Sequence, residues 1–194
     1  MKLVFIHGAG ATPDSFNYIE PKLNKKYSRI YIEYESELGF MNNLNKMICS
    51  LTALNEDIFL ISHSLGGVYS VLLTEYLGGL VKGGVSIATP FNGCESASML
   101  NLLKPCKLYK DIGTYSEPIS MSRRVVLSVP WTQIVTTMGR SHWMNTENDG
   151  VVTRASMTHR NDMEFVEVDS GHYEVMLRNE TINIINSKLS LVTM

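Results

Sequence analysis

The sequence predicts an α/β fold in a single domain over residues 1–194, with a mostly parallel sheet covered by helices on both faces. Short apolar runs alternate along the chain with segments whose apolar residues recur at helical spacing, which is typical of parallel sheets with right-handed crossovers. A length of 194 residues suits one domain with a sizeable core. A strand–turn–helix stretch with a serine at its bend occupies the middle of this pattern.

The first part of the chain contains two expected strands, each followed by an expected helix. The strand at 3–6 ends in a loop of small residues whose backbone can approach a ligand closely. The expected elements are a strand at 3–6, a short or kinked helix capped by Asp14 or Ser15, a strand at 29–34 and a helix at 40–54. Pro21 is the reason to expect a short or kinked first helix.

The central stretch predicts a sharp turn that presents a serine. Residues 58–61 are all apolar and read as a buried strand, and helical spacing returns after Leu65. A strand that turns into a helix with a serine at the bend is typical of a nucleophile elbow, G-x-S-x-G. Here Ser64 is the candidate nucleophile, and Ser62 stands where the pattern has its first glycine. Taken alone, the pattern also fits a plain strand–turn–helix unit with a surface serine.

The second half of the chain continues the alternation. We expect a strand at 81–88, an irregular segment at 94–124 with one or two short helices, a strand at 129–135, a polar loop at 138–149, a strand at 163–168 and a helix at 173–189. In parallel sheets the ligand site lies beyond the carboxyl ends of the strands. His7, Ser64, Thr89, Asp149 and His172 all follow expected strands, so we expect them to gather at one edge.

Three of these residues have the types needed for nucleophilic catalysis. A serine hydroxyl needs a neighbouring base, and the base needs a carboxylate that fixes its tautomer. We assign His172 as the base and Asp149 as the carboxylate, in the chain order Ser64, Asp149, His172. Each has a simpler interpretation: Asp149 begins an Asp-Gly turn, His172 begins a helix, and Asp169 is a rival carboxylate. The backbone N–H groups of Ala9 and Leu65 are the candidate oxyanion hole.

Composition and charge exclude several other classes. A net charge of −2 gives no general attraction to nucleic acid or anionic membranes. Cys49, Cys94 and Cys106 lack metal-ligand spacing and read as reduced thiols, although a Cys94–Cys106 pair stays open. The first apolar run is too short for a signal peptide, and no run reaches the ~18 apolar residues of a membrane span. We therefore expect a cytoplasmic protein without a stable membrane anchor, metal or cofactor.

Four parts of the sequence together resemble the α/β-hydrolase superfamily, and within it the small lipases and esterases. They are 5–9 (FIHGA), 61–67 (ISHSLGG), 88–93 (ATPFNG), and 148–152 (NDGVV) with 171–172 (GH). The resemblance implies a sheet of about six parallel strands, with Ser64, Asp149 and His172 as its catalytic residues. It also implies that the segment at about 94–124 is a cap or lid, although its apolar residues equally fit a helix packed on the sheet.

The expected function is therefore that of a serine hydrolase that cleaves a small or lipid-like carboxylic ester through an acyl-enzyme. Thioester or amide cleavage and acyl transfer would use the same residues and stay open as alternatives. A non-catalytic binding protein on a hydrolase scaffold is the rival from another class, because fold does not imply function. The acyl chain length and the oligomeric state do not follow from the sequence.

Overall fold

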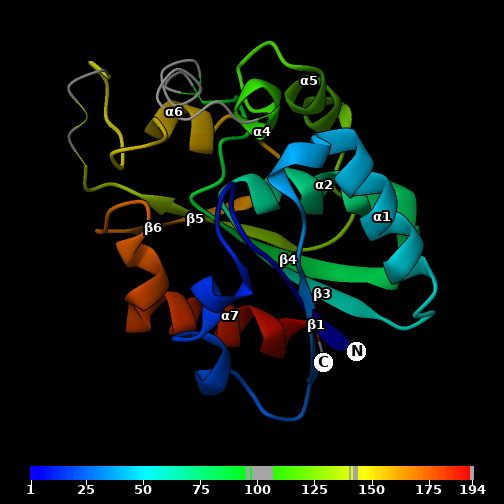
Figure 1. Cartoon of the computed structure of the whole chain (residues 1–194). Coiled ribbons are helices and arrows are strands. Elements are labelled where there is room, and N and C mark those ends of the chain that lie inside the picture. The colour runs from blue at the N-terminus through cyan, green and yellow to red at the C-terminus, as the bar shows by residue number, and fades with distance from the viewer. Residues whose placement is uncertain (95–96, 98–106, 140, 142–143, 193–194) are drawn as a thin grey trace.

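The chain is built around one six-stranded sheet in which every strand pair is parallel (Figure 1). The computed structural model describes residues 1–94, 97, 107–139, 141 and 144–192. The strand order is β2-β1-β3-β4-β5-β6. The strands are β1 (Lys2–Ile6), β2 (Ser28–Ile32), β3 (Ile58–His63), β4 (Val81–Ile87), β5 (Trp131–Thr136) and β6 (Glu164–Val168). This confirms the predicted fold class and the expected six strands.

Burial along the strands follows their place in the sheet. Every residue of β3 and β5 is buried, whereas the edge strands β2 and β6 consist of exposed and partly buried residues apart from the buried Val168. Strands covered on both faces read as continuous apolar runs, which is why the sequence predicted 58–61 as a buried strand.

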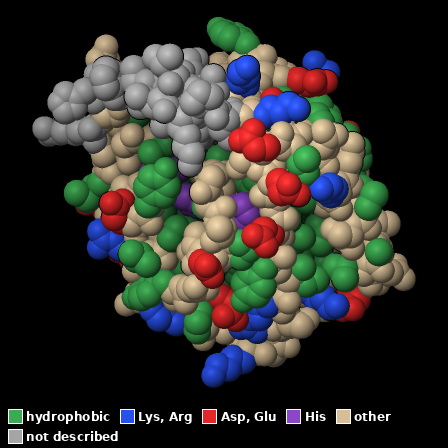
Figure 2. Space-filling view, in the orientation of Figure 1, with side chains coloured by type: hydrophobic (Ala, Val, Ile, Leu, Met, Phe, Trp, Pro, Cys, Tyr) green, Lys and Arg blue, Asp and Glu red, His purple; other side chains and the backbone are tan. Residues whose placement is uncertain are grey.

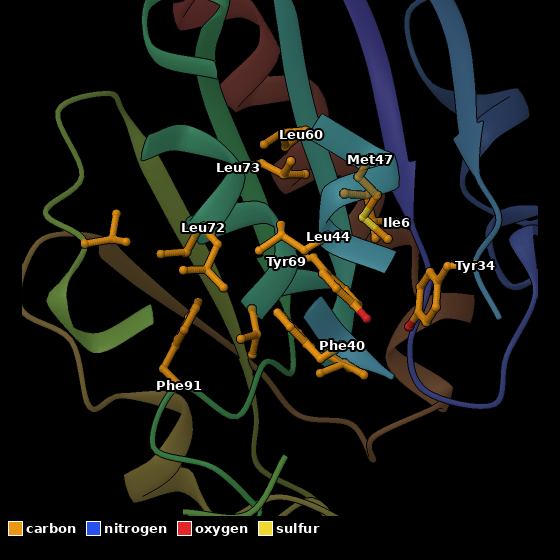
Figure 3. Packing of buried hydrophobic residues seen from close by; sticks show 14 of the residues in the cluster. Ile6, Tyr34, Phe40, Leu44, Met47, Leu60, Tyr69, Leu72, Leu73 and Phe91 are labelled. Carbon is orange, nitrogen blue, oxygen red and sulfur yellow. The ribbon is translucent and has the colours of Figure 1, made fainter. Parts of the chain in front are cut away.

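Helices cover both faces of the sheet (Figure 1). The α-helices are α1 (Phe40–Thr52), α2 (Leu65–Leu77), α4 (Lys107–Asp111), α5 (Glu117–Arg124), α6 (Arg154–Met157) and α7 (Asn179–Leu191). α1 and α2 pack on one face, where Leu44 and Met47 meet Tyr69, Leu72 and the sheet (Figure 3). α7 packs on the other face together with the segment after β1. The two cores hold the sheet from both sides.

Two expected helices are wrong in detail. The helix expected near Asp14 is a pair of 3₁₀ turns, η1 (Pro13–Phe16) and η2 (Glu20–Lys22), each with a proline in its first turn. The helix expected at 173–189 is split into a 3₁₀ turn, η5 (Glu174–Leu177), and α7. Arg178 between them is extended, with φ −94° and ψ 135°, which ends η5 before α7 begins. The short helix α6 was not predicted.

The irregular segment at 94–124 is described only in part. α4 and α5 are the short helices expected there, with α5 starting at Glu117 and Pro118 in its first turn. Residues 95–96 and 98–106 lie outside the described residues, and with them Cys106 of the open Cys94–Cys106 pairing. Among the described residues, no helix is both long enough and apolar enough to cross a membrane.

Candidate active site

The turn between β3 and α2 holds Ser64 in a strained backbone conformation, with φ 51° and ψ −124°. The turn is tight because the helix starts against the end of β1. A Cβ added to Gly66 would lie 2.1 Å from the carbonyl oxygen of Ile6, and one added to Gly67 would lie 2.0 Å from Thr89 Oγ1. Neither position therefore accommodates a side chain.

The serine that replaces the first glycine of the pattern is accommodated within β3. Ser62 is fully buried and lies in register between Ile6 of β1 and Ser86 of β4. The turn after it is closed by hydrogen bonds from the Ser64 N–H to Ile87 O (2.8 Å) and from the Gly67 N–H to Ser64 O (2.9 Å). The departure from the pattern at Ser62 thus leaves the strand–turn–helix geometry in place.

The loop after β6 brings His172 to this turn. The Ser64 hydroxyl donates to His172 Nε2 at 3.1 Å, and His172 Nδ1 donates to Asp149 Oδ2 at 2.7 Å. His172 is 2% exposed and Asp149 is 3% exposed, whereas Ser64 is partly exposed. The structure therefore brings together the three residues predicted from the sequence. Two hydrogen bonds connect them, and the serine is the member that is accessible to solvent.

Asp149 is held by both of its carboxylate oxygens. Oδ1 accepts from the backbone N–H groups of Val151 (2.9 Å) and Val152 (2.7 Å), and Oδ2 accepts from the Thr136 hydroxyl (2.5 Å) and from His172. Asp149 does stand at an Asp-Gly turn, since Gly150 has φ 97°. The turn and the contact with His172 are thus parts of one arrangement, not alternatives.

The charge of Asp149 is favoured despite its burial. Burial by itself would raise the pKa of Asp149, but hydrogen bonds from His172, Thr136 and Val152 and the charge of His172 outweigh it and lower the pKa below its ordinary value. Asp149 therefore stays ionised at neutral pH. A carboxylate at Nδ1 keeps the proton of His172 on that nitrogen and leaves Nε2 free to accept from Ser64.

The backbone groups proposed as oxyanion donors border the same serine. Leu65 is the first residue of α2, where an N–H group has no partner within the helix. Gly8 lies against the turn, since a Cβ added to it would lie 3.1 Å from Ser64 Cβ. Ala9 follows Gly8 and lines the same cleft as Ser64.

The cleft in front of Ser64 is mostly apolar and has a volume of about 550 Å³. Its two walls are the segment after β1 and the segment after His172. Its apolar lining comes mainly from Ala9, Ala11, Tyr18, Tyr173, Met176 and Leu177, and Asp14 is its one carboxylate among the described residues. Figure 2 shows histidine side chains at the surface of this face, among apolar and acidic ones. No lysine or arginine of the described chain lines this cleft.

The rival carboxylate Asp169 and the described histidines outside the site have other partners or lie at the surface. Asp169 is exposed, and its carboxylate accepts from the Thr137 hydroxyl at 3.2 Å instead of meeting His172. His7 is buried, and its Nδ1 donates to Gly8 O at 2.8 Å within the loop after β1. His159 is exposed, and His142 lies outside the described residues. The described residues contain no group of three histidine, cysteine or carboxylate side chains that could hold a metal ion.

One residue of the site has contacts that the sequence did not indicate. His63 lies directly before the turn, and its Nε2 lies 2.9 Å from the backbone oxygen of His172. Its position next to Ser64 was the only signal in the sequence, and adjacency does not reveal a contact with a residue 109 positions away.

No protein-family model matches the chain, and no curated protein matches its sequence. Solved structures do match its fold. The mature lipase BlEst2 of Bacillus licheniformis superposes with a TM-score of 0.78 at 15% identity, over 100% of this chain and 92% of that one. The metagenomic carboxyl esterase MGS0156 gives 0.73 at 14%, over 100% and 75%. An α/β superfamily hydrolase from Oenococcus oeni PSU-1 gives 0.69 at 15%, over 100% and 93%.

At these identities the likeness concerns the fold. The chain has the α/β-hydrolase fold, as its resemblance to that superfamily implied, and the neighbouring structures include lipases and esterases. The chemistry of this chain must be argued from its own residues.

Proposed function

We propose that the protein is a serine hydrolase that cleaves carboxylic esters, with Ser64 as nucleophile, His172 as general base and acid, and Asp149 as the carboxylate that orients His172. The observation that carries the proposal is the hydrogen-bonded line from Asp149 through His172 to Ser64, which ends in an apolar cleft. A binding protein would not need a strained serine aligned with a buried His–Asp pair.

The reaction proceeds in two halves. Ser64 Oγ attacks the ester carbonyl carbon while its proton passes to His172 Nε2, and the resulting oxyanion accepts from the N–H groups of Leu65 and Ala9. His172 then gives that proton to the departing alkoxide, which leaves as the alcohol. A water molecule attacks the acyl-enzyme, its proton passing to His172 and then to Ser64, and the carboxylic acid is released.

The cleft favours an uncharged, apolar substrate of moderate size. Apolar clefts of a few hundred cubic ångströms bury most of a drug-sized ligand, and this cleft of about 550 Å³ falls in that range. Its carboxylate, Asp14, repels anionic groups, and the described residues supply no cation to offset it. We therefore infer an ester with a neutral alkyl chain of medium length in preference to an anionic ester.

The irregular segment contributes to this cleft. Ile112, which follows α4, is buried and lines the same cleft as Ser64. We propose that the segment at about 94–124 acts as a cap over one end of the substrate chain.

A panel of chromogenic esters from acetyl to palmitoyl tests the proposal directly. Wild type should hydrolyse the medium chains best, and Ser64→Ala should lower turnover by about six orders of magnitude if the three residues act as a unit. Ser70→Ala is the matched control, because it removes a buried hydroxyl from the same helix and should leave turnover unchanged. Turnover of Ser64→Ala equal to that of wild type would rule the mechanism out.

A further inference from the structure

The residue before the nucleophile is in direct contact with the base. His63 ends β3 and is only 3% exposed. Its ring lies 4.9 Å from the ring of His172, tilted by 52°, and its Nε2 lies 2.9 Å from the backbone oxygen of His172. A carbonyl oxygen can only accept, so Nε2 of His63 must carry a proton and donate it.

The main chain of His172 is therefore held by two hydrogen bonds, one to Asp149 and one from His63. Its N–H donates to the backbone oxygen of Asp149 at 3.1 Å, and its carbonyl accepts from His63. The ring of Tyr173, which is 65% exposed, packs edge-on against the His172 ring, with the ring centroids 5.0 Å apart. The position of the base thus depends on hydrogen bonds to its backbone as well as to its ring.

His63 also contacts the loop that carries Ala9. A Cβ added to Gly8 would lie 3.1 Å from His63 Nδ1, so this ring edge packs directly on the backbone of the loop. One buried imidazole therefore touches the nucleophile turn, the base and the loop of the candidate oxyanion donors.

We propose that His63 is a positioning residue: as a neutral imidazole with its proton on Nε2, it fixes the main chain of His172 relative to Ser64. The inference rests on the proposed hydrolytic function, in which His172 must align with the Ser64 hydroxyl. A displacement of about 1 Å in such an alignment costs about 100-fold in rate.

The surroundings of His63 keep it neutral. Burial, then repulsion from His172 and to a smaller extent His7, lower the pKa of His63 to about 3, against the raising effects of its hydrogen bond to His172 and of Asp149. When His172 accepts the Ser64 proton, no second positive charge stands beside it.

Three substitutions at one position separate positioning from packing. Glutamine places its amide nitrogen as many bonds from Cβ as Nε2 of histidine, so His63→Gln can still donate to the carbonyl of His172. Asparagine reaches only as far as Nδ1, and leucine has no donor. We expect His63→Leu and His63→Asn to lower kcat for the best ester by 30-fold to 100-fold with little change in KM, and His63→Gln to recover at least tenfold. His159→Leu, at an exposed histidine, is the control.

The outcomes distinguish this inference from the proposed function. An active wild type with equal kcat losses in all three variants, or with none, overturns the positioning role. A wild type that turns over no ester overturns the proposed function instead. In that case, and where the variants fail to fold, nitrogen-15 NMR of wild-type histidines decides the inference. A neutral His63 with its proton on Nε2 from pH 5 to 8 supports it. A proton on Nδ1, or titration near pH 6.5, overturns it.

Discussion

The nucleophile and the base of the candidate site are held by two regions that are built in different ways. The β3–α2 region is buried on every side: from Leu65 to Leu73 no residue of α2 reaches the surface. The region from β6 to η5 is covered unevenly: His172 and Val175 are buried, whereas Tyr173 and Leu177 are 65% and 60% exposed. Close packing fixes Ser64, whereas hydrogen bonds to Asp149 and from His63 help to fix His172.

Because of this difference, substitutions in the two regions should first affect different properties of the protein. In a close-packed region, an added or lost methyl group acts first on stability, because the surroundings cannot relax. In a region held by hydrogen bonds, a lost partner acts first on alignment and therefore on rate.

After the loss of the nucleophile itself, the largest effect is expected at the carboxylate that contacts the base. Asp149→Asn keeps the shape of the side chain but loses the charge that sets the tautomer of His172. A change of this kind in a serine triad lowers turnover by about 10⁴-fold while the geometry is kept. Steady-state ester hydrolysis measures it, with the exposed Asp169→Asn as control. A drop of less than tenfold in Asp149→Asn would show that the carboxylate does not serve His172.

The same carboxylate gives a pH dependence of stability. The pKa of Asp149 is lower in the folded protein than its ordinary value, so its ionisation stabilises the fold above the unfolded pKa of about 3.9. That contribution is lost as the pH falls through the lowered pKa. Denaturant unfolding of wild type and Asp149→Asn should therefore give stabilities that differ at pH 7 and converge below pH 4. A difference that grows towards low pH would contradict the assigned direction.

A matched pair of glycines compares the two regions directly. The Cβ of Gly66→Ala would lie 2.1 Å from a backbone oxygen in the packed region, whereas that of Gly171→Ala would meet, at 2.4 Å, the end of the flexible Glu174 side chain. We expect Gly66→Ala to destabilise the protein by about 3 kcal/mol or more, and Gly171→Ala by less than about 1 kcal/mol. Chemical denaturation measures both. Equal losses would remove the distinction between the regions.

The exposed wall of the cleft should set chain-length preference. Leu177 lines the cleft and is 60% exposed, so it is free to cover an alkyl chain. Leu177→Ser should lower kcat/KM for octanoyl esters by about tenfold, equivalent to about 1.4 kcal/mol of lost apolar contact, and leave acetyl esters unchanged. Val126→Ser, at another exposed apolar residue that does not line the cleft, is the control. Equal losses for both chain lengths would assign Leu177 to folding and not to substrate.

The smallest effect is expected at the opposite wall. Asp14→Asn should raise kcat/KM for an anionic ester by about twofold to threefold at low salt, because an exposed carboxylate repels it only through a high dielectric. Neutral esters should not respond, and the gain should vanish in high salt. Glu75→Gln, at an exposed carboxylate of α2, is the control. A gain that persists in high salt would refute the electrostatic explanation.

The two regions also differ in how well their secondary structure could be predicted from the sequence. The packed region was predicted well, because 58–61 and the helix after Leu65 carry strong apolar patterns that only this packing satisfies. The end of the chain was predicted less well. Its apolar spacing at 173–189 favoured one helix, but the extended Arg178 breaks it in two. Local geometry of this kind depends on tertiary contacts that the spacing does not encode.

The sequence likewise predicted some features of the candidate site and not others. Ser64, Asp149 and His172 could be singled out because strand ends place them at one edge of the sheet. The contact of His63 with the carbonyl of His172 could not, because it depends on how the loop after β6 returns to the turn.

A fluorophosphonate probe with peptide mapping tests the central claim most directly, since it reacts with serines that an adjacent base has activated. The account predicts one label per chain on the peptide that contains Ser64, no label in Ser64→Ala, and strongly slowed labelling in Asp149→Asn. A label on another serine, or labelling that survives in Ser64→Ala, would contradict it.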